Sequence, residues 1–154
     1  MSTVDERLAE LGIDLPAARK PAFEYVAVAL HDNIAYVSGQ LPWRDAENVI
    51  TGKVGSEVDL EGAQEAARLC TLFALANLKQ RLGSLDSIEQ VLKLTGFVAS
   101  APGFTGQPKV IDAASKLLGD VFADKGHHAR SAIGVAELPR GAAVEIEMIV
   151  AVRQ

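Results

Sequence analysis

The sequence predicts an α+β domain in which two long helices pack on one face of a single sheet. Three observations support this prediction. The 154 residues fit one domain, 1–154. Hydrophobic residues make up 49% and charged residues 23% of the chain, as in a folded protein with a substantial core. The expected elements run helix, two strands, helix, strand, helix and two strands, with no internal repeat or linker.

The first elements are a short helix and a hairpin. Residues 4–11 carry Val4, Leu8 and Leu11 at helical spacing, and Gly12 ends the helix. Residues 1–20 are therefore expected to form an N-terminal helix and an extended lead-in. Two strands are expected at 23–30 and 34–39, because residues 31–33 have the composition of a tight turn.

The middle of the chain predicts a long loop followed by a long helix. Residues 40–58 are a longer connection than a compact domain needs, and such loops usually carry function or cover another part of the molecule. A helix is expected at 59–82, with Asp59 as its N-cap and Gly83 after its last turn. One face of this helix is rich in alanine, so it can lie close to a sheet.

The remaining strands and the second long helix are expected between residue 88 and the end of the chain. Residues 88–100 read as a strand that is apolar on both faces. Apolar residues at i, i+3 and i+4 over 110–122 predict a helix that ends near residues 125–126. Two final strands are expected at 129–136 and 143–152.

The last strand also predicts an assembly. One side of it carries only apolar residues, and the other side carries Glu145, Glu147, Ile149 and Ala151. Two helices can cover only one face of the sheet, so apolar residues on the second face would be exposed in a monomer. We expect that face to be buried against other copies of the chain.

Composition excludes several classes of function. The chain has 15 Lys and Arg against 20 Asp and Glu, a formal net charge of -5 and a pI of about 5.2. These values, without a basic tract, weigh against a protein that binds a nucleic-acid backbone. A single cysteine, Cys70, excludes an intrachain disulfide framework and a thiolate metal cluster within one chain.

Motifs that would indicate a membrane, a signal peptide or a cofactor are missing from the sequence. No apolar run approaches the ~18 residues that a membrane span needs, and the N-terminus lacks the basic and apolar regions of a signal peptide. We therefore expect a cytoplasmic protein. There is no phosphate loop, dinucleotide fingerprint or nucleophile elbow, and no cofactor is expected.

Three charged residues are candidates for chemistry. Arg130 begins a strand among small residues, where its guanidinium could hold a carboxylate by two parallel hydrogen bonds. The alternative is an interface salt bridge or a solvated strand end. Glu145 and Glu147 share the face that is expected to meet another subunit, and a carboxylate there is either paired or functional. Before any resemblance is considered, pairing with Arg130 or a lysine is the simpler account.

Other residues point less clearly to a site. The rings of His127 and His128 should point to opposite sides of an extended chain, and no metal-binding spacing includes His31, so no metal site is expected. Cys70 lies on the apolar face of a helix, where a cysteine is usually a small core residue. Tyr25 and Trp43 could line a cleft or belong to the core.

Residues 129–139 (ARSAIGVAELP), followed by 144–147 (VEIE), resemble the signature of the RidA family, also called YjgF/YER057c/UK114. Tyr25 with residues 34–40 (IAYVSGQ) is a second match. The resemblance covers about residues 23–152. It implies a chorismate-mutase-like fold that assembles as a homotrimer with a cleft at each subunit interface.

The resemblance also implies an activity. In characterised members this is hydrolysis of reactive enamines and imines, such as 2-aminoacrylate, to 2-keto acids and ammonia. Arg130 matches the arginine that holds the substrate carboxylate, and Glu145 matches the glutamate that positions the hydrolytic water. Tyr25, Ser38 and Gly39 match the positions that line the cleft. The partner implied is a small carboxylate, without metal, membrane or nucleic acid.

Two other functions remain open at this stage. One is a regulatory trimer that binds small carboxylates or 2-keto acids without turnover. The other is the ribonuclease or translation inhibitor of older family labels, which the acidic composition disfavours. The sequence departs from the family because residues 110–118 lack the Asn-x-x-Tyr stretch of many members, and because Gly126, His127 and His128 stand where a proline usually precedes the arginine motif.

Overall fold

The computed structural model describes residues 2–154 and confirms the predicted order of long elements. The N-terminal half contains α1 (Val4–Glu10), β1 (Val28–His31), β2 (Ile34–Gln40) and α2 (Leu60–Leu82). The C-terminal half contains β3 (Ile88–Ala99), α3 (Gln107–Phe122), β4 (Ala129–Val135) and β5 (Val144–Val152).

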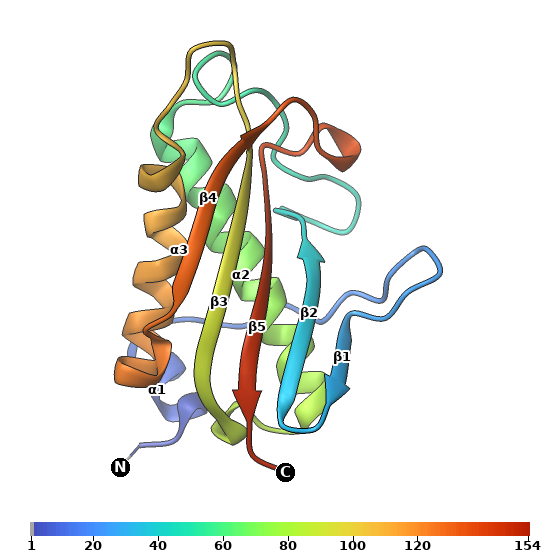
Figure 1. Cartoon of the computed structure of the whole chain (residues 1–154), viewed down its shortest axis with the longest axis vertical. Coiled ribbons are helices and arrows are strands. Elements are labelled where there is room, and N and C mark those ends of the chain that lie inside the picture. Colours follow the sequence, from blue (N-terminus) through green and yellow to red (C-terminus); the bar gives the residue numbers. More distant parts are fainter. Residues whose placement is uncertain (1) are drawn as a thin grey trace.

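The strands form one sheet in the order β1-β2-β5-β3-β4. All neighbours are antiparallel except β3 and β4, which are parallel and are joined through α3. Figure 1 shows α2 and α3 on the same side of the sheet, with the other face bare. The predicted α+β fold with both long helices on one face is therefore confirmed.

The core lies between α2, α3 and the sheet. The alanine-rich face of α2 is fully buried at Ala63, Ala67 and Ala74, and small side chains allow the helix to approach the strands closely. Cys70 is also completely buried on this face, as predicted. On β5, the apolar side faces the helices and is buried.

The first predicted strand is wrong over residues 23–27. These residues form bends, and β1 begins only at Val28, whose partner is Val37. The register of β2 against β5 shifts between Val37 and Gln40, and before Val28 the contacts with β2 are those of Ser38, whose backbone N–H and hydroxyl donate to the carbonyl oxygens of Ala27 and Val26. The turn is also shorter than expected, because His31 pairs with Ile34 and only two residues connect them.

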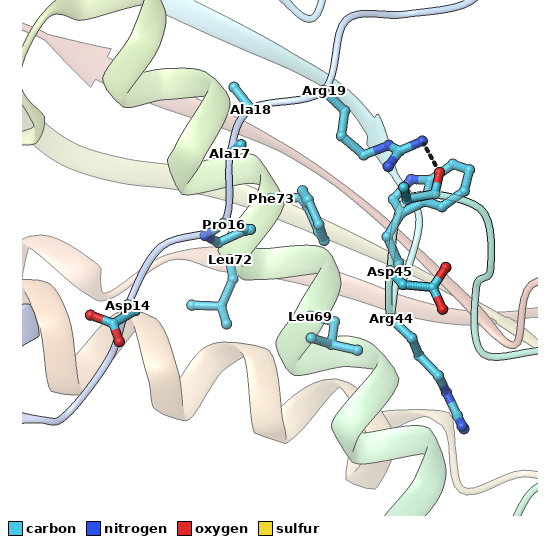
Figure 2. A pocket seen from close by; sticks show the side chains of 12 residues that line it. Asp14, Pro16, Ala17, Ala18, Arg19, Arg44, Asp45, Leu69, Leu72 and Phe73 are labelled. Carbon is cyan, nitrogen blue, oxygen red and sulfur yellow. Dashed lines mark hydrogen bonds between the residues drawn. The ribbon is translucent and has the colours of Figure 1, made fainter.

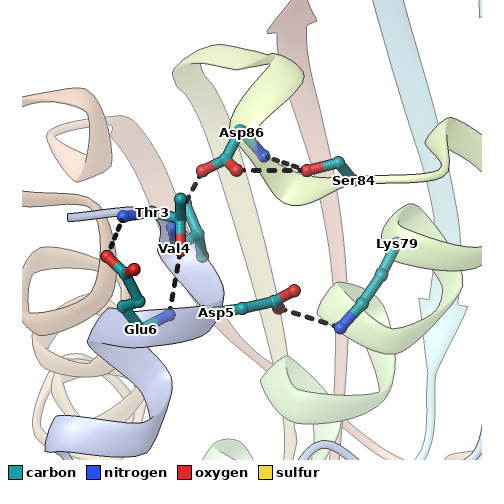
Figure 3. A network of polar contacts seen from close by, with 7 residues as sticks. All are labelled: Thr3, Val4, Asp5, Glu6, Lys79, Ser84 and Asp86. Atoms are coloured by element: carbon teal, nitrogen blue, oxygen red, sulfur yellow. Dashed lines mark hydrogen bonds and ion pairs between the residues drawn. The ribbon is translucent and has the colours of Figure 1, made fainter.

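The N-terminal helix is fixed to the domain by polar contacts (Figure 3). Thr3 and Glu6 form a capping box at the start of α1. The backbone N–H of Val4 donates to Asp86 Oδ1 at 2.8 Å, and Lys79 at the end of α2 pairs with Asp5 at 2.8 Å. The lead-in that follows α1 crosses the outer side of α2.

The bare face of the sheet carries the apolar side chains that the sequence predicts for it. Tyr36 on β2 is 47% exposed and Ile133 on β4 is 44% exposed. Phe97 and Ile149 share this face through their register with Ile133 and Tyr36. Burial of this face in a trimer stays a prediction. None of the helices in residues 2–154 is long and apolar enough to cross a membrane.

Candidate functional site

Arg130 lies on β4, which forms one edge of the sheet. Its side chain is on the helix side, where it reaches α3. Nη1 donates to Ser115 Oγ at 3.1 Å, and Nη2 donates to the carbonyl oxygen of Pro108 at 3.2 Å. The Arg130 side chain is 24% exposed. The guanidinium is therefore held in one orientation at an accessible edge and keeps further N–H donors for a ligand.

His128 contacts Ser115 and so orients the hydroxyl that accepts from Arg130. His128 Nδ1 lies 2.6 Å from the carbonyl oxygen of Gly126, which can only accept, so Nδ1 carries a hydrogen. In the neutral ring, Nε2 then accepts from the hydroxyl of Ser115 at 2.9 Å. The single hydroxyl hydrogen of Ser115 is thus directed to His128, which leaves its lone pairs for Arg130.

Within one chain, Arg130 does not pair with Glu145 or Glu147, and pairing between subunits stays a prediction. The ion-pair partner of Arg130 is Asp112 on α3, with 2.8 Å between Nη1 and Oδ1. Asp112 is 64% exposed, so the contact is open to solvent and exchangeable. Within residues 2–154, neither glutamate forms an ion pair with a lysine or an arginine.

Glu145 lies on the bare face of the sheet, against the end of β2. It is half-buried, and a Cβ at Gly39 would overlap its carboxylate. Burial, and secondarily the charge of Glu147, raises the pKa of Glu145 above its ordinary value. A carboxylate with a raised pKa is a stronger base, so Glu145 is suited to accept a proton from water.

Two buried amides brace the irregular end of β2. The Gln40 side chain donates to the carbonyl oxygen of Ser38 at 3.0 Å and accepts from Asn77 at 3.0 Å. Ser38 Oγ in turn donates to the carbonyl oxygen of Val26 at 2.7 Å. These bonds fix the backbone of Ser38 and Gly39 beside Glu145.

Tyr25 lies in the bent segment before β1 and is 53% exposed. It lines a pocket of about 440 Å³ between this segment and the C-terminal part of α2. Trp43 does not line this pocket but another one, on the outer side of α2. The two aromatic residues therefore do not share a cleft within one chain.

The structure brings Ser38, Gly39 and Glu145 together but leaves Arg130 apart from them. Glu145 pairs in register with Phe97 of β3, and its side chain is on the bare face of the sheet. Arg130 pairs in register with Leu94 of β3, and its side chain is on the helix side, against α3. One whole strand, β3, separates β4 from β5. A single chain cannot use both groups on one small ligand.

No metal centre is formed by the described residues: within 2–154 there is no group of three or more His, Cys, Asp or Glu side chains that could hold an ion.

The sequence profile of the family described as Endoribonuclease L-PSP matches residues 16–152. The chain belongs to this family, which includes RidA and UK114. As an L-PSP family protein, it is 44% identical over 148 residues to Protein TCP17 of Trypanosoma cruzi, covering 96% of this chain and 92% of that protein. It is 30% identical to a 2-iminobutanoate/2-iminopropanoate deaminase of Dermatophagoides farinae, with 91% and 94% of the two chains covered.

A solved crystal structure has the same fold as this chain over nearly the whole length of both chains. The crystal structure of Atu1372 from Agrobacterium tumefaciens, a protein of unknown function, is 46% identical with a TM-score of 0.90. It covers 99% of this chain and 94% of its own. The similarity thus extends beyond residues 16–152, which the family profile matches, to the N-terminal helix.

Several residues that hold Arg130 in place cannot be recognised from the sequence motif around it. Asp112 and Ser115 lie three positions apart on α3, and both contact Arg130. That spacing places two side chains on one helix face, which is the signal that could have found them. The sequence around His128 suggests only a possible metal ligand, and nothing local indicates that its ring turns towards Ser115.

Proposed function

We propose that this protein hydrolyses reactive enamines and imines of small 2-amino acids to 2-keto acids and ammonia, and that it does so as a homotrimer. The observation that carries the proposal is the fixed, accessible guanidinium of Arg130 at the edge of the sheet. A guanidinium so held can bind a substrate carboxylate with little loss of side-chain entropy. The relative from Dermatophagoides farinae, named as a deaminase of this type, supports the reaction class.

The assembly follows from the separation of the two charged groups. Arg130 is at the β4 edge, and Glu145 is on the bare face of the same chain. A second copy packed on the bare face would cover its apolar residues and bring its own β4 edge towards Glu145. We infer that each site combines Arg130 of one subunit with Tyr25, Gly39 and Glu145 of its neighbour.

The chemistry needs no group beyond these residues. Arg130 binds the carboxylate of a 2-imino acid, whose C2 atom is already electrophilic. Glu145 accepts a proton as the water oxygen bonds to C2 of the protonated imine, and returns it to the nitrogen of the resulting carbinolamine. As the C–N bond breaks and ammonia leaves, the carbinolamine hydroxyl releases its proton to Glu145 and becomes the keto oxygen, so one water is consumed for each 2-keto acid and ammonia formed. Holding the anion and orienting the water supply most of the rate acceleration.

The test uses 2-aminoacrylate generated in place by a serine dehydratase. The purified protein should accelerate the formation of pyruvate above the uncatalysed rate, and light scattering should give the mass of a trimer. A protein that leaves the pyruvate rate unchanged, while it binds 2-oxobutyrate in calorimetry, would instead be the non-catalytic carboxylate-binding trimer. A monomer mass at micromolar concentration would remove the interfacial site.

A further inference from the structure

A pocket that neither Arg130 nor Glu145 lines lies on the outer side of α2 (Figure 2). It has a volume of about 510 Å³ and is enclosed by the lead-in, the loop after β2 and the helix. Its floor is apolar and consists of Leu69, Leu72 and Phe73 of α2, with Pro16 of the lead-in beside Leu72. We call it the lead-in pocket. Its size is that of a site for one small molecule.

Arg19 is the fixed cation of this pocket. Its guanidinium carbon lies 3.5 Å from the centroid of the Trp43 ring, and Nη2 donates to the carbonyl oxygen of Ala46 at 3.1 Å. Stacking and this hydrogen bond together hold the plane of the guanidinium. No carboxylate of residues 2–154 lies within 4.0 Å of its nitrogens. An oriented arginine beside an apolar floor therefore retains donors for an anion from outside the chain.

Asp45 lies in the chain between Trp43 and Ala46, the two residues that hold Arg19, but its carboxylate already accepts hydrogen bonds within its own turn. Asp45 accepts from the backbone N–H groups of Glu47 and Asn48 and from the Asn48 amide. These hydrogen bonds, and to a lesser extent the charge of Arg19, lower the pKa of Asp45, and its oxygens hold the turn. Arg44, on the same rim, is exposed and forms no ion pair within the described chain.

We propose that the lead-in pocket binds a monocarboxylate with a branched or aromatic apolar tail. The carboxylate pairs with Arg19, and the tail lies on Leu69, Leu72 and Phe73. The pocket is on the helix side of the molecule, away from the bare sheet face that the proposed trimer would bury. Arg19 also lines the pocket of Tyr25, but Arg130 and Glu145 line neither pocket, so binding here uses neither of the two charged groups proposed for deamination.

Trp43 provides a direct readout, because it is the only tryptophan of the chain. Titration with 4-methylpentanoate and with 3-phenylpropanoate should change its fluorescence saturably, and calorimetry should give one site per chain. Acetate, which lacks the tail, and 4-methylpentanamide, which lacks the charge, should not bind. The corresponding 2-amino and 2-oxo acids then distinguish the natural sources of the same carboxylate chemistry.

Variants separate this pocket from the Arg130 site. Arg19→Gln should weaken binding at least about tenfold, the loss expected when a charged hydrogen-bond donor is removed. Arg153→Gln, an exposed arginine near the C-terminus that does not line the pocket, and Arg130→Lys should both keep the wild-type affinity. The proposal fails if calorimetry detects no binding up to about 10 mM ligand, if the amide binds as well as the acid, or if Arg130→Lys abolishes binding while Arg19→Gln does not.

Discussion

Arg130 and Glu145 lie on opposite faces of the sheet, with β3 between their strands. Each has its own support: Arg130 is held by Ser115 and Pro108, and Glu145 lies against Gly39. The two halves of the proposed site are therefore built independently within one chain. They can act on one substrate only if a second copy brings them together.

The two charged residues should have separable roles. Arg130→Lys keeps the charge but loses the planar guanidinium, so 2-oxobutyrate binding should weaken by roughly 1.5–3 kcal/mol. Glu145→Gln keeps the shape and removes the proton acceptor, so kcat should fall by about 10²-fold or more with a smaller change in binding. Calorimetry and steady-state kinetics measure the two effects. Wild-type affinity in Arg130→Lys, with the assembly intact, would place the carboxylate site elsewhere.

Ser115 should act through Arg130. Ser115→Ala removes the acceptor that holds Nη1, and we expect 2-oxobutyrate affinity to fall by about 1 kcal/mol, the value of one hydrogen bond. Ser115→Thr keeps the hydroxyl and should restore affinity, which a purely structural role would not require. Equal affinity of wild type and Ser115→Ala for 2-oxobutyrate would show that this hydrogen bond does not position the Arg130 guanidinium.

A side chain at position 39 should displace Glu145. Gly39→Ala places a Cβ where the Glu145 carboxylate lies, so kcat should fall about tenfold or more while the fold is retained. Gly119→Ala on α3 is the matched control, because a Cβ there meets no atom within 4 Å. It should leave kcat unchanged and keep or slightly raise the melting temperature. The assignment of Glu145 fails if both variants turn over substrate like wild type.

Glu145 should also make stability depend on pH. Burial raises its pKa in the folded chain above the ordinary 4.5, so the folded state binds this proton more tightly than the unfolded state does. The free energy of unfolding contributed by Glu145 should therefore decrease as pH rises from about 4.5 through the raised pKa. Urea unfolding across this range should show a smaller decrease for Glu145→Gln than for wild type. Glu89→Gln, an exposed carboxylate on β3, is the control and should behave like wild type.

The long helices and strands could be predicted from the sequence because the spacing of their apolar residues reflects which side chains are buried. The i, i+3, i+4 stripe of α3 and the alternation along β5 match the buried residues of each. Residues 23–27 could not be predicted: they alternate like a strand, but β2 is irregular after Val37 and the regular ladder of β1 with β2 begins at the pair Val28 and Val37. Local patterns do not encode such long-range pairing.

The candidate site was predictable only in part. The motif around Arg130 and the residues near Gly39 are recognisable, but their contacts are not. Asp112 lies 18 positions before Arg130, and only the packing of α3 on β4 makes it the ion-pair partner in place of Glu145. Asn77 and Gln40 likewise meet only when α2 packs on β2.

The most direct test of the central claim, a site shared between subunits, is complementation between two inactive variants. Arg130→Ala and Glu145→Gln chains, each carrying a different affinity tag, are co-expressed, and mixed trimers are isolated through both tags. If each site takes Arg130 from one subunit and Glu145 from its neighbour, every mixed trimer contains one intact site of three, and an unselected equal mixture contains about one quarter of the wild-type sites. Pyruvate formation should therefore return in the mixed trimers, while each variant alone stays inactive. Mixed trimers as inactive as the parent variants would contradict the shared site.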